Sequence, residues 1–221
     1  MYASDVFKTK GSDLEITFIG HGTLMFTYGD LVIHIDPTSM FGDYSDLPEA
    51  DLILITHEHR DHLDQELIEE LRTDGTVIVG NEGTAQQVDG CITMKNGDVK
   101  SVLGLEIEAV PAYNIQHMRS PGVPFHPPGE GNGYVVTFED TRVYIAGDTE
   151  NIPEMKELKD IDIAFLPMNL PYTMTPEMVV ESVEMFAPKV VYPYHFGDTD
   201  TSALVKLLAD ADVEVRVRDL Q

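Results

Sequence analysis

Residues 57–62 of this chain, HEHRDH, combine imidazole and carboxylate side chains at a spacing that suits the binding of divalent cations. They follow the apolar run LILIT, which predicts a buried strand, and they lead into DHLDQELIEEL, which predicts a helix. In an extended chain residues two apart point the same way, so His57 and His59 can converge on one point. Asp61 and His62 can face a second point nearby. Because zinc and similar cations prefer such ligands, we predict a metal site at this strand-to-helix turn.

The alternative interpretation of this segment is a polar surface turn that is rich in histidine by chance. The chain has only eight histidines among its 221 residues. A fixed H-x-H-x-D-H pattern would then arise by accident in roughly one in a thousand sequences of this composition. Metal binding is therefore the better explanation.

Two more candidate ligands follow apolar runs later in the chain. Asp148 follows VYIAG and His195 follows VVYPY, as His57 follows LILIT. Ligand sites in α/β proteins gather at the carboxyl ends of strands, so these three segments can meet at one edge. Taken alone, Asp148 could belong to a Gly-Asp turn and His195 could be a core histidine. Together with the histidine cluster, they are better interpreted as metal ligands.

Several of these segments resemble one known family. HEHRDH is similar to the H-x-H-x-D-H signature of the metallo-β-lactamase superfamily, whose members are mostly metal-dependent hydrolases. RVYIAGDT resembles the strand that ends at the family's metal-bridging aspartate, and KVVYPYHFGD resembles the last strand with its ligand histidine. FIGHGTLMF and LVIHIDP resemble the opening hairpins of the branch related to ascorbate 6-phosphate lactonase. The resemblance spans residues 14–197 and implies a four-layer αββα sandwich with the metals at one edge.

The same resemblance implies two divalent metal ions, zinc in the first place, with manganese or iron as alternatives. The implied ligands are His57, His59 and a further histidine for the first ion, and Asp61, His62 and His195 for the second, with Asp148 bridging. A hydroxide between the cations would attack a carbonyl or phosphoryl centre, with Asp61 and Asp148 as the catalytic carboxylates. The redox diiron members carry an acid where this chain has His59, which argues against oxygen reduction.

The further histidine of the first site has two candidates. In the lactonase-like branch it often follows a run resembling VPAY, but that position is Asn114 here. His126 precedes PPGEGNGYVV, in which glycines lead into a predicted strand. This order of histidine, glycines and strand resembles the segment that usually provides this ligand in the family. His117 lies earlier in the same segment, residues 117–133, whose many prolines and glycines predict a long loop. We favour His126, with His117 as the alternative.

Other polar residues near these segments have less specific roles. Asp36 could orient a ligand imidazole or cap a turn, with nothing to separate the two. His34 is expected to be structural. His21 could support a ligand side chain, but a structural role is favoured for it as well. Loop residues expected to border the site are Asn169, Tyr172 and Tyr194.

The remaining pattern predicts an α/β protein with many strands and few, mostly peripheral helices. Early β-rich runs are separated by Gly-Asp turns, which indicates antiparallel hairpins. In the helix predicted over residues 175–186, Thr175 is placed as N-cap and Pro176 at the first helical position. We find no repeat or low-complexity linker and expect a single domain over residues 1–221.

The charge balance limits the classes of partner. The chain has 39 acidic and 14 basic residues, a net charge of −25, which disfavours binding to nucleic acids and anionic membranes. The acids are scattered, which fits either a generally acidic surface or adaptation to a salty cytoplasm. No apolar run approaches the roughly 20 residues of a membrane span, and the N-terminus has no signal pattern. The single cysteine, Cys91, suits a reducing compartment, so we expect a cytoplasmic protein.

The predicted function is that of a metal-dependent hydrolase acting on a small molecule, with a lactone or a phosphorylated metabolite favoured. The alternative is a non-catalytic metal-binding or regulatory protein that retains the ligand set. A homo-oligomer is compatible with either interpretation.

Overall fold

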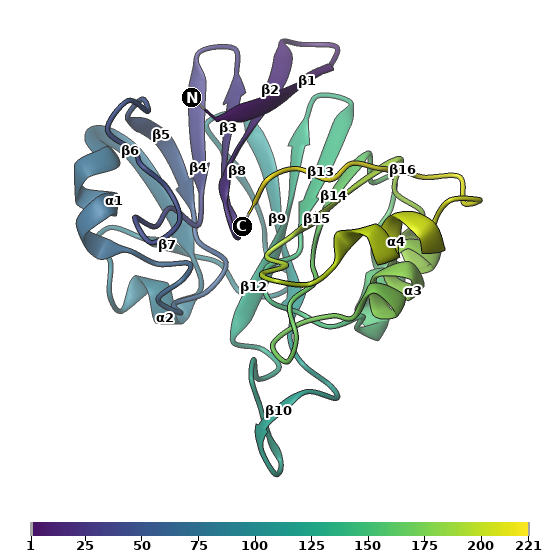
Figure 1. Ribbon diagram of the computed structural model, residues 1–221. Coiled ribbons are helices and arrows are strands. Elements are labelled where there is room, and N and C mark those ends of the chain that lie inside the picture. Colours follow the sequence, from purple (N-terminus) through teal and green to yellow (C-terminus); the bar gives the residue numbers. More distant parts are fainter. Residues whose placement is uncertain (1, 221) are drawn as a thin grey trace.

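The computed structural model of the protein describes residues 2–220. Two seven-stranded sheets pack face to face, and helices cover the outer face of each sheet (Figure 1). A separate two-stranded ribbon extends from one end of the sandwich. The predicted four-layer αββα architecture is therefore confirmed.

The first sheet is formed by consecutive strands of the N-terminal half. In spatial order they are β1 (Ala3–Lys8), β2 (Asp13–Gly20), β3 (Thr23–Tyr28), β4 (Leu31–Ile35), β5 (Ala50–Leu54), β6 (Arg72–Gly80) and β7 (Ile92–Thr93). Strands β1 to β4 pair antiparallel, as the early turns predicted, and β4 to β7 pair parallel. Gly29 in the tight turn between β3 and β4 has φ +59°, a conformation that glycine adopts readily.

The second sheet comes from the C-terminal half. Its spatial order is β16 (Glu214–Val215), β15 (Val190–Tyr194), β14 (Ile163–Pro167), β13 (Thr141–Ile145), β12 (Gly131–Phe138), β9 (Leu105–Ala112) and β8 (Val99–Val102). Strands β13 to β16 run parallel, and the others pair antiparallel.

The helices are short and peripheral, as predicted. The first sheet carries α1 (Gln65–Leu71) and α2 (Glu82–Ala85), and the second carries the 3₁₀ helix η1 (Pro153–Glu157), α3 (Pro176–Phe186) and α4 (Thr201–Leu207). Helix α3 has the predicted cap, because the Thr175 side chain accepts from the backbone N–H of Met178. Helix α1 begins later than the sequence pattern suggested, because Asp64, and not a residue near Asp61, caps it. Residues 55–64 are therefore an irregular loop that carries the whole HEHRDH motif.

Alternating side chains of the buried strands form two apolar layers. In β5 and the residue after it, Leu52 and Leu54 face the core between the sheets, whereas Ile53 and Ile55 belong to the layer beneath α1. This two-sided burial explains why residues 52–55 are all apolar. It also holds the following loop rigidly between two packed layers.

The segment over residues 117–133 differs in part from the predicted long loop. It contains the antiparallel ribbon of β10 (Met118–Ser120) and β11 (Val123–Pro124), and its last three residues begin β12. The ribbon projects from the body of the protein (Figure 1). Within residues 2–220, no helix combines the length and apolarity that crossing a membrane requires.

Candidate metal centre

Seven predicted side chains meet at the edge of the sandwich where strands of both sheets end. They form a first group, His57, His59 and His126, and a second group, Asp61, His62, Asp148 and His195. Within each group the potential ligand atoms all lie within 4.8 Å of one another. The loop after β5 supplies four of these side chains. The others come from the loop before β12 and from the ends of β13 and β15.

The carboxylate of Asp148 lies between the two groups. Its Oδ2 is 3.3 Å from Nε2 of His126 and 3.9 Å from Nε2 of His57. Its Oδ1 is 3.4 Å from Nε2 of both His62 and His195. Each oxygen therefore faces a different group, which is the arrangement that a bridging carboxylate requires.

The chemistry of the converging atoms fits a divalent cation. Within the described chain, Nε2 of His62, Nε2 of His195 and Oδ1 of Asp148 are buried without a hydrogen-bond partner. A buried polar atom left unpaired costs about 1–3 kcal/mol, so several of them pointing at one place need a ligand to offset that cost. Imidazole nitrogens and carboxylate oxygens are a donor set that suits zinc and related ions.

The protonation of the first group favours metal binding. Burial lowers the pKa of His57 well below its usual value, and the neighbouring His62 adds to this effect. Burial also lowers the pKa of His59, with a smaller contribution from His126. Neutral imidazole is the form that coordinates a metal, so the site itself holds these rings in their binding form.

The carboxylates of the second group are held in the ionised form. Burial alone would raise the pKa of Asp148, but the charges of His195 and His62 outweigh it and keep the pKa well below its usual range. For Asp61, the rings of His195 and His21, whose Nε2 atoms lie 3.4 Å and 3.7 Å from Oδ2, likewise outweigh burial and lower the pKa strongly. Burial would lower the pKa of His62, yet Asp148 and Asp36 raise it well above normal. The second group thus contains two ionised carboxylates that favour the charged form of His62.

A fully buried carboxylate orients rings of both groups. Oδ2 of Asp36 lies 2.8 Å from Nδ1 of His62, and the same oxygen accepts from the Thr56 hydroxyl at 2.7 Å. That hydroxyl is 3.1 Å from Nδ1 of His57. Of the two roles considered for Asp36, the structure shows contact with the imidazole of a candidate ligand.

His126 is oriented by residues that the sequence pattern did not identify. Oδ1 of Asn114 accepts from the backbone N–H of His126 at 2.8 Å and lies 2.7 Å from its Nδ1. The Asn114 amide donates in turn to Glu150 at 3.1 Å. Glu150 is buried and also accepts backbone N–H groups of residues 115–117 at 2.7–2.8 Å. Both residues follow strand ends, which is the only sequence signal that could have pointed to them.

The structure places the other histidines outside both groups. Nδ1 of His117 is 2.8 Å from Oε1 of Glu150, so this ring is directed away from His57 and His59. The His21 ring contacts the His195 ring at a tilt of 43°, with ring centroids 3.7 Å apart. His34 is buried in the first sheet, with Nε2 3.0 Å from the carbonyl of Pro48. The contacts of His34 agree with its expected structural role, whereas His21 lies against candidate ligands, with its Nε2 also 3.7 Å from Oδ2 of Asp61.

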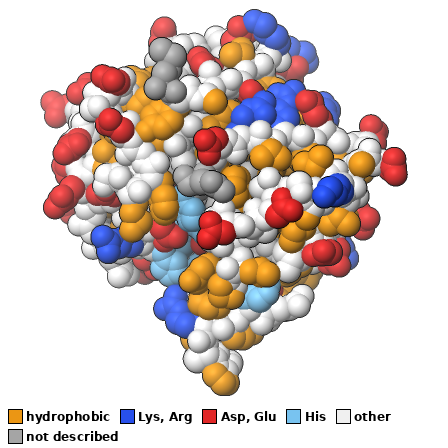
Figure 2. Space-filling model, in the orientation of Figure 1, with side chains coloured by type: hydrophobic (Ala, Val, Ile, Leu, Met, Phe, Trp, Pro, Cys, Tyr) orange, Lys and Arg blue, Asp and Glu red, His pale blue; other side chains and the backbone are white. Residues whose placement is uncertain are grey.

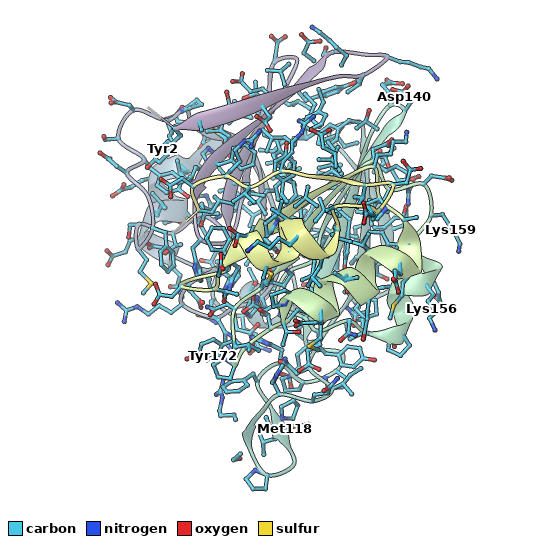
Figure 3. The ribbon with its side chains drawn as sticks, turned by 45° about the vertical axis from the view of Figure 1, so that its right-hand side comes forward. Tyr2, Met118, Asp140, Lys156, Lys159 and Tyr172 are labelled. Atoms are coloured by element: carbon cyan, nitrogen blue, oxygen red, sulfur yellow. The ribbon has the colours of Figure 1, made fainter. Side chains whose placement is uncertain are left out.

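A cleft of about 640 Å³ opens above the two groups. Beyond the candidate ligands, it is lined by side chains that include Met40, Phe41, Arg60, Arg119, Phe125, Asn169 and Tyr172. Histidine surface is visible on this face, with basic surface close by (Figure 2). Tyr172 lies at the same end of the molecule as the ribbon residue Met118 (Figure 3).

Tyr194 does not line this cleft, although we expected it to border the site. It is buried, and its hydroxyl accepts from the backbone N–H of Gly147 at 2.8 Å. Gly147 has φ +65°, and a Cβ there would lie 2.8 Å from a carbonyl oxygen, so only glycine fits. Tyr194 therefore supports the turn that presents Asp148.

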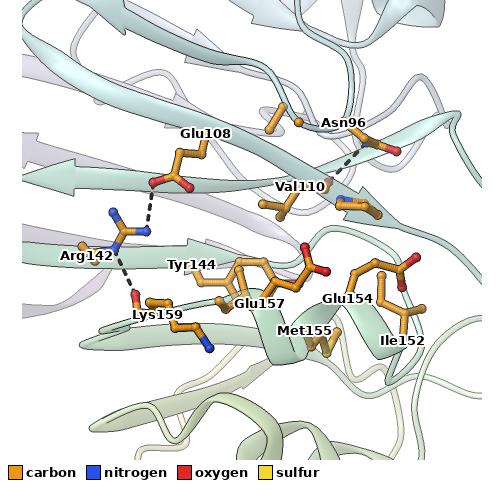
Figure 4. A pocket seen from close by; sticks show the side chains of 14 residues that line it. Asn96, Glu108, Val110, Arg142, Tyr144, Ile152, Glu154, Met155, Glu157 and Lys159 are labelled. Atoms are coloured by element: carbon orange, nitrogen blue, oxygen red, sulfur yellow. Dashed lines mark hydrogen bonds and ion pairs between the residues drawn. The ribbon is translucent and has the colours of Figure 1, made fainter.

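A second hollow, of about 430 Å³, lies beside η1 on the outer face of the second sheet (Figure 4). Its arginine, Arg142, is held by Glu108 at 2.9 Å and by the carbonyl of Lys159 at 3.1 Å. None of the candidate ligands lines this hollow. The candidate ligands therefore lie at the edge of the sandwich and not in this second hollow.

Comparison with known proteins shows similarity along most of the chain. A family model described as the beta-lactamase superfamily domain matches residues 15–195. The UPF0173 metal-dependent hydrolase of Methanopyrus kandleri is 33% identical over 196 residues, which cover 83% of this chain and 84% of that protein. A crystal structure from Parabacteroides distasonis, of a protein assigned to the metal-dependent hydrolases, is 50% identical over 100% of both chains, with a TM-score of 0.96. Igni18, a metallo hydrolase from Ignicoccus hospitalis, is 25% identical, covers 94% of this chain and 95% of its own, and has a TM-score of 0.75.

Proposed function

This chain belongs to the metallo-β-lactamase superfamily of metal-dependent hydrolases, and on that basis we propose that it hydrolyses a small molecule at a centre of two divalent cations. The observation that carries the proposal is the position of Asp148, whose two oxygens face separate histidine groups. In this proposal His57, His59 and His126 hold one cation, and Asp61, His62 and His195 hold the other. Asp148 is shared.

Zinc is the proposed metal, because a donor set of imidazoles and two carboxylates suits a borderline cation. Two such cations would lower the pKa of a shared water from about 15.7 towards 7 and would polarise the bond that is cut. Manganese and iron accept the same ligands. Elemental analysis of the purified protein identifies the ion.

The chain's own residues supply orientation and a hydrogen-bond acceptor. Asp61 is ionised, its side chain is 36% exposed, and it faces the cleft, so its Oδ2 can accept a hydrogen bond from an attacking water. Asp36 and Thr56 fix the rings of His62 and His57 and prevent them from rotating. The apolar layers beneath the loop keep this arrangement rigid without a substrate.

The proposed substrate is a lactone or a phosphorylated metabolite. A cleft of about 640 Å³ suits a small molecule, and ligand clefts in proteins typically measure about 300–1,000 Å³. The net charge of −25 disfavours a nucleic acid or an anionic membrane as partner. We also infer a cytoplasmic location from the single cysteine, and a homo-oligomer is compatible with the proposal.

The test is a screen of purified, metal-loaded protein against lactones, phosphodiesters and thioesters. We expect turnover of at least one class that is abolished by a chelator and by His57→Ala. His117→Ala is the matched control, because this histidine lies outside both groups, and it should keep the activity. Stoichiometric metal without turnover of any class would contradict the hydrolase and favour the non-catalytic metal-binding protein.

A further inference from the structure

Two of the six arginines differ from the rest in having no acidic partner. Four are paired with carboxylates: Arg72 with Glu69, Arg142 with Glu108, Arg216 with Glu214, and Arg218 with Asp5. Within residues 2–220, Arg60 and Arg119 have no such ion pair, although acidic residues outnumber basic ones 39 to 14. Both exposed side chains line the cleft above the candidate metal centre.

Arg60 and Arg119 reach this cleft from separate parts of the fold. Arg60 lies in the loop after β5, between two candidate ligands, and Arg119 lies on β10 of the projecting ribbon. The Arg119 guanidinium is 5.8 Å from the ring centroid of Phe125. That ring meets Tyr172 edge-on at 5.0 Å. The wall that carries Arg119 is therefore both cationic and aromatic.

We propose that Arg60 and Arg119 bind an anionic group of the substrate, a phosphate or a carboxylate, that is separate from the bond being cut. This inference rests on the proposed function for the position of the reacting bond. A guanidinium binds either anion through paired N–H donors, and it does so more readily when no protein carboxylate already occupies those donors. The aromatic wall beside Arg119 would contact a planar or apolar part of the same molecule.

The charge of the protein favours such a subsite if the substrate is anionic. The net charge of −25 repels an approaching anion, and Asp61 and Asp148 line the same cleft. Bound cations would neutralise these two carboxylates. The arginines would extend the local positive potential from the metal centre to the mouth of the cleft, where the anion enters.

The direct test is an NMR titration of the full-length protein labelled with ¹⁵N-arginine, zinc-loaded and zinc-free. The probes are phenyl phosphate and benzoate, with benzyl alcohol as the neutral analogue. We expect the Nε–Hε signals of Arg60 and Arg119 to shift with at least one anion and not with the alcohol. A response to phenyl phosphate alone identifies a phosphate subsite, and a response to benzoate alone identifies a carboxylate subsite.

Charge-matched variants separate arginine binding from binding at the metal. Arg60→Gln and Arg119→Gln should each weaken the binding of the responding probe about tenfold, as expected for the loss of a charge-assisted contact. Lys206→Gln makes the same charge change at an exposed residue of α4 outside the cleft and should leave binding unchanged. No shift with either anion, or equal affinity in all three variants, would overturn the proposal.

The outcome is distinguishable from failure of the proposed function. Anion binding at the arginines in a protein that turns over no substrate would contradict the hydrolase and leave the subsite in place. Hydrolysis that requires metal but is unchanged in both arginine variants, for neutral and anionic substrates alike, would contradict the subsite and leave the hydrolase in place.

Discussion

Nδ1 of His62 lies 2.8 Å from Oδ2 of Asp36, so Nε2 of the same ring faces Oδ1 of Asp148 at 3.4 Å. The contact with Asp36 keeps one proton on Nδ1, so a cation that displaces the other ring proton binds at Nε2. A carboxylate that touches no proposed ion thus determines which atom of His62 is available.

Asp36→Asn tests this arrangement. An amide that donates to Nδ1 would move the ring proton to Nε2 and block the metal-binding atom, so we expect the affinity of the second group to fall about 10–100-fold. The affinity is measured by competition with a chromophoric chelator. Asp30→Asn, at an exposed turn, is the control. Equal affinity in the two variants would show that Asp36 does not orient the ring.

Asp148→Ala tests whether one carboxylate serves both groups. Because its oxygens lie 3.3–3.4 Å from histidines of both groups, its loss should reduce the bound metal to half or less. Elemental analysis of the purified variant measures the ratio of metal to protein. A ratio equal to that of the wild type would contradict the bridging role.

Asn114→Leu tests the support of His126. The substitution removes the acceptor 2.7 Å from Nδ1 of His126, which frees the ring to rotate and should weaken the first group about tenfold or more. Chelator competition measures this change. Binding at the second group, which Asn114 does not touch, should be retained, and loss of both ions together would argue against a local effect.

His34→Gln tests a pH dependence that is independent of the metal centre. Burial lowers the pKa of His34 to about 4, below its usual value of 6.5, with partial compensation from the carbonyl of Pro48. The unfolded chain therefore binds the proton more readily, and the stability from neutral His34 is present above pH 6.5 and lost as the pH falls towards 4. Between pH 7 and pH 5 this loss is about 2 kcal/mol.

The measurement for His34→Gln is urea unfolding of the chelator-treated protein at pH 7 and pH 5. The variant should lose about 2 kcal/mol less free energy of unfolding between these pH values than the wild type. Other groups that titrate in this range contribute equally to both proteins. A parallel decline in the two proteins would mean that His34 is not held neutral in the fold.

Much of the fold and the candidate centre could be predicted because each depends on local patterns. LILIT identifies β5 since both of its faces are buried, and the family signature identifies His57 to His62 since these ligands share one short loop. By contrast, β1 has no apolar run, because most of its side chains are exposed and it is held by pairing with β2. Sequence pattern alone therefore does not identify it.

The contacts that orient the rings could not be predicted, because they join residues far apart in the chain. Asp36 and His62 are 26 positions apart, and Asn114 and Glu150 are 36 positions apart. No spacing rule connects such residues, and a buried asparagine or glutamate in a loop has no distinctive pattern. The choice between His117 and His126 depended on these contacts, so sequence reasoning favoured His126 but did not exclude His117.

Each sheet is formed by one half of the chain, so metal binding can report whether the two halves have assembled. The strands of the first sheet end at Thr93 and those of the second begin at Val99, and each half contributes only part of the seven side chains. A chain cut at the exposed turn around Gly97 would yield two fragments, each with an incomplete set of ligands. The cation should then increase the affinity of the two fragments for each other. Measuring this increase would assay the metal centre without a substrate.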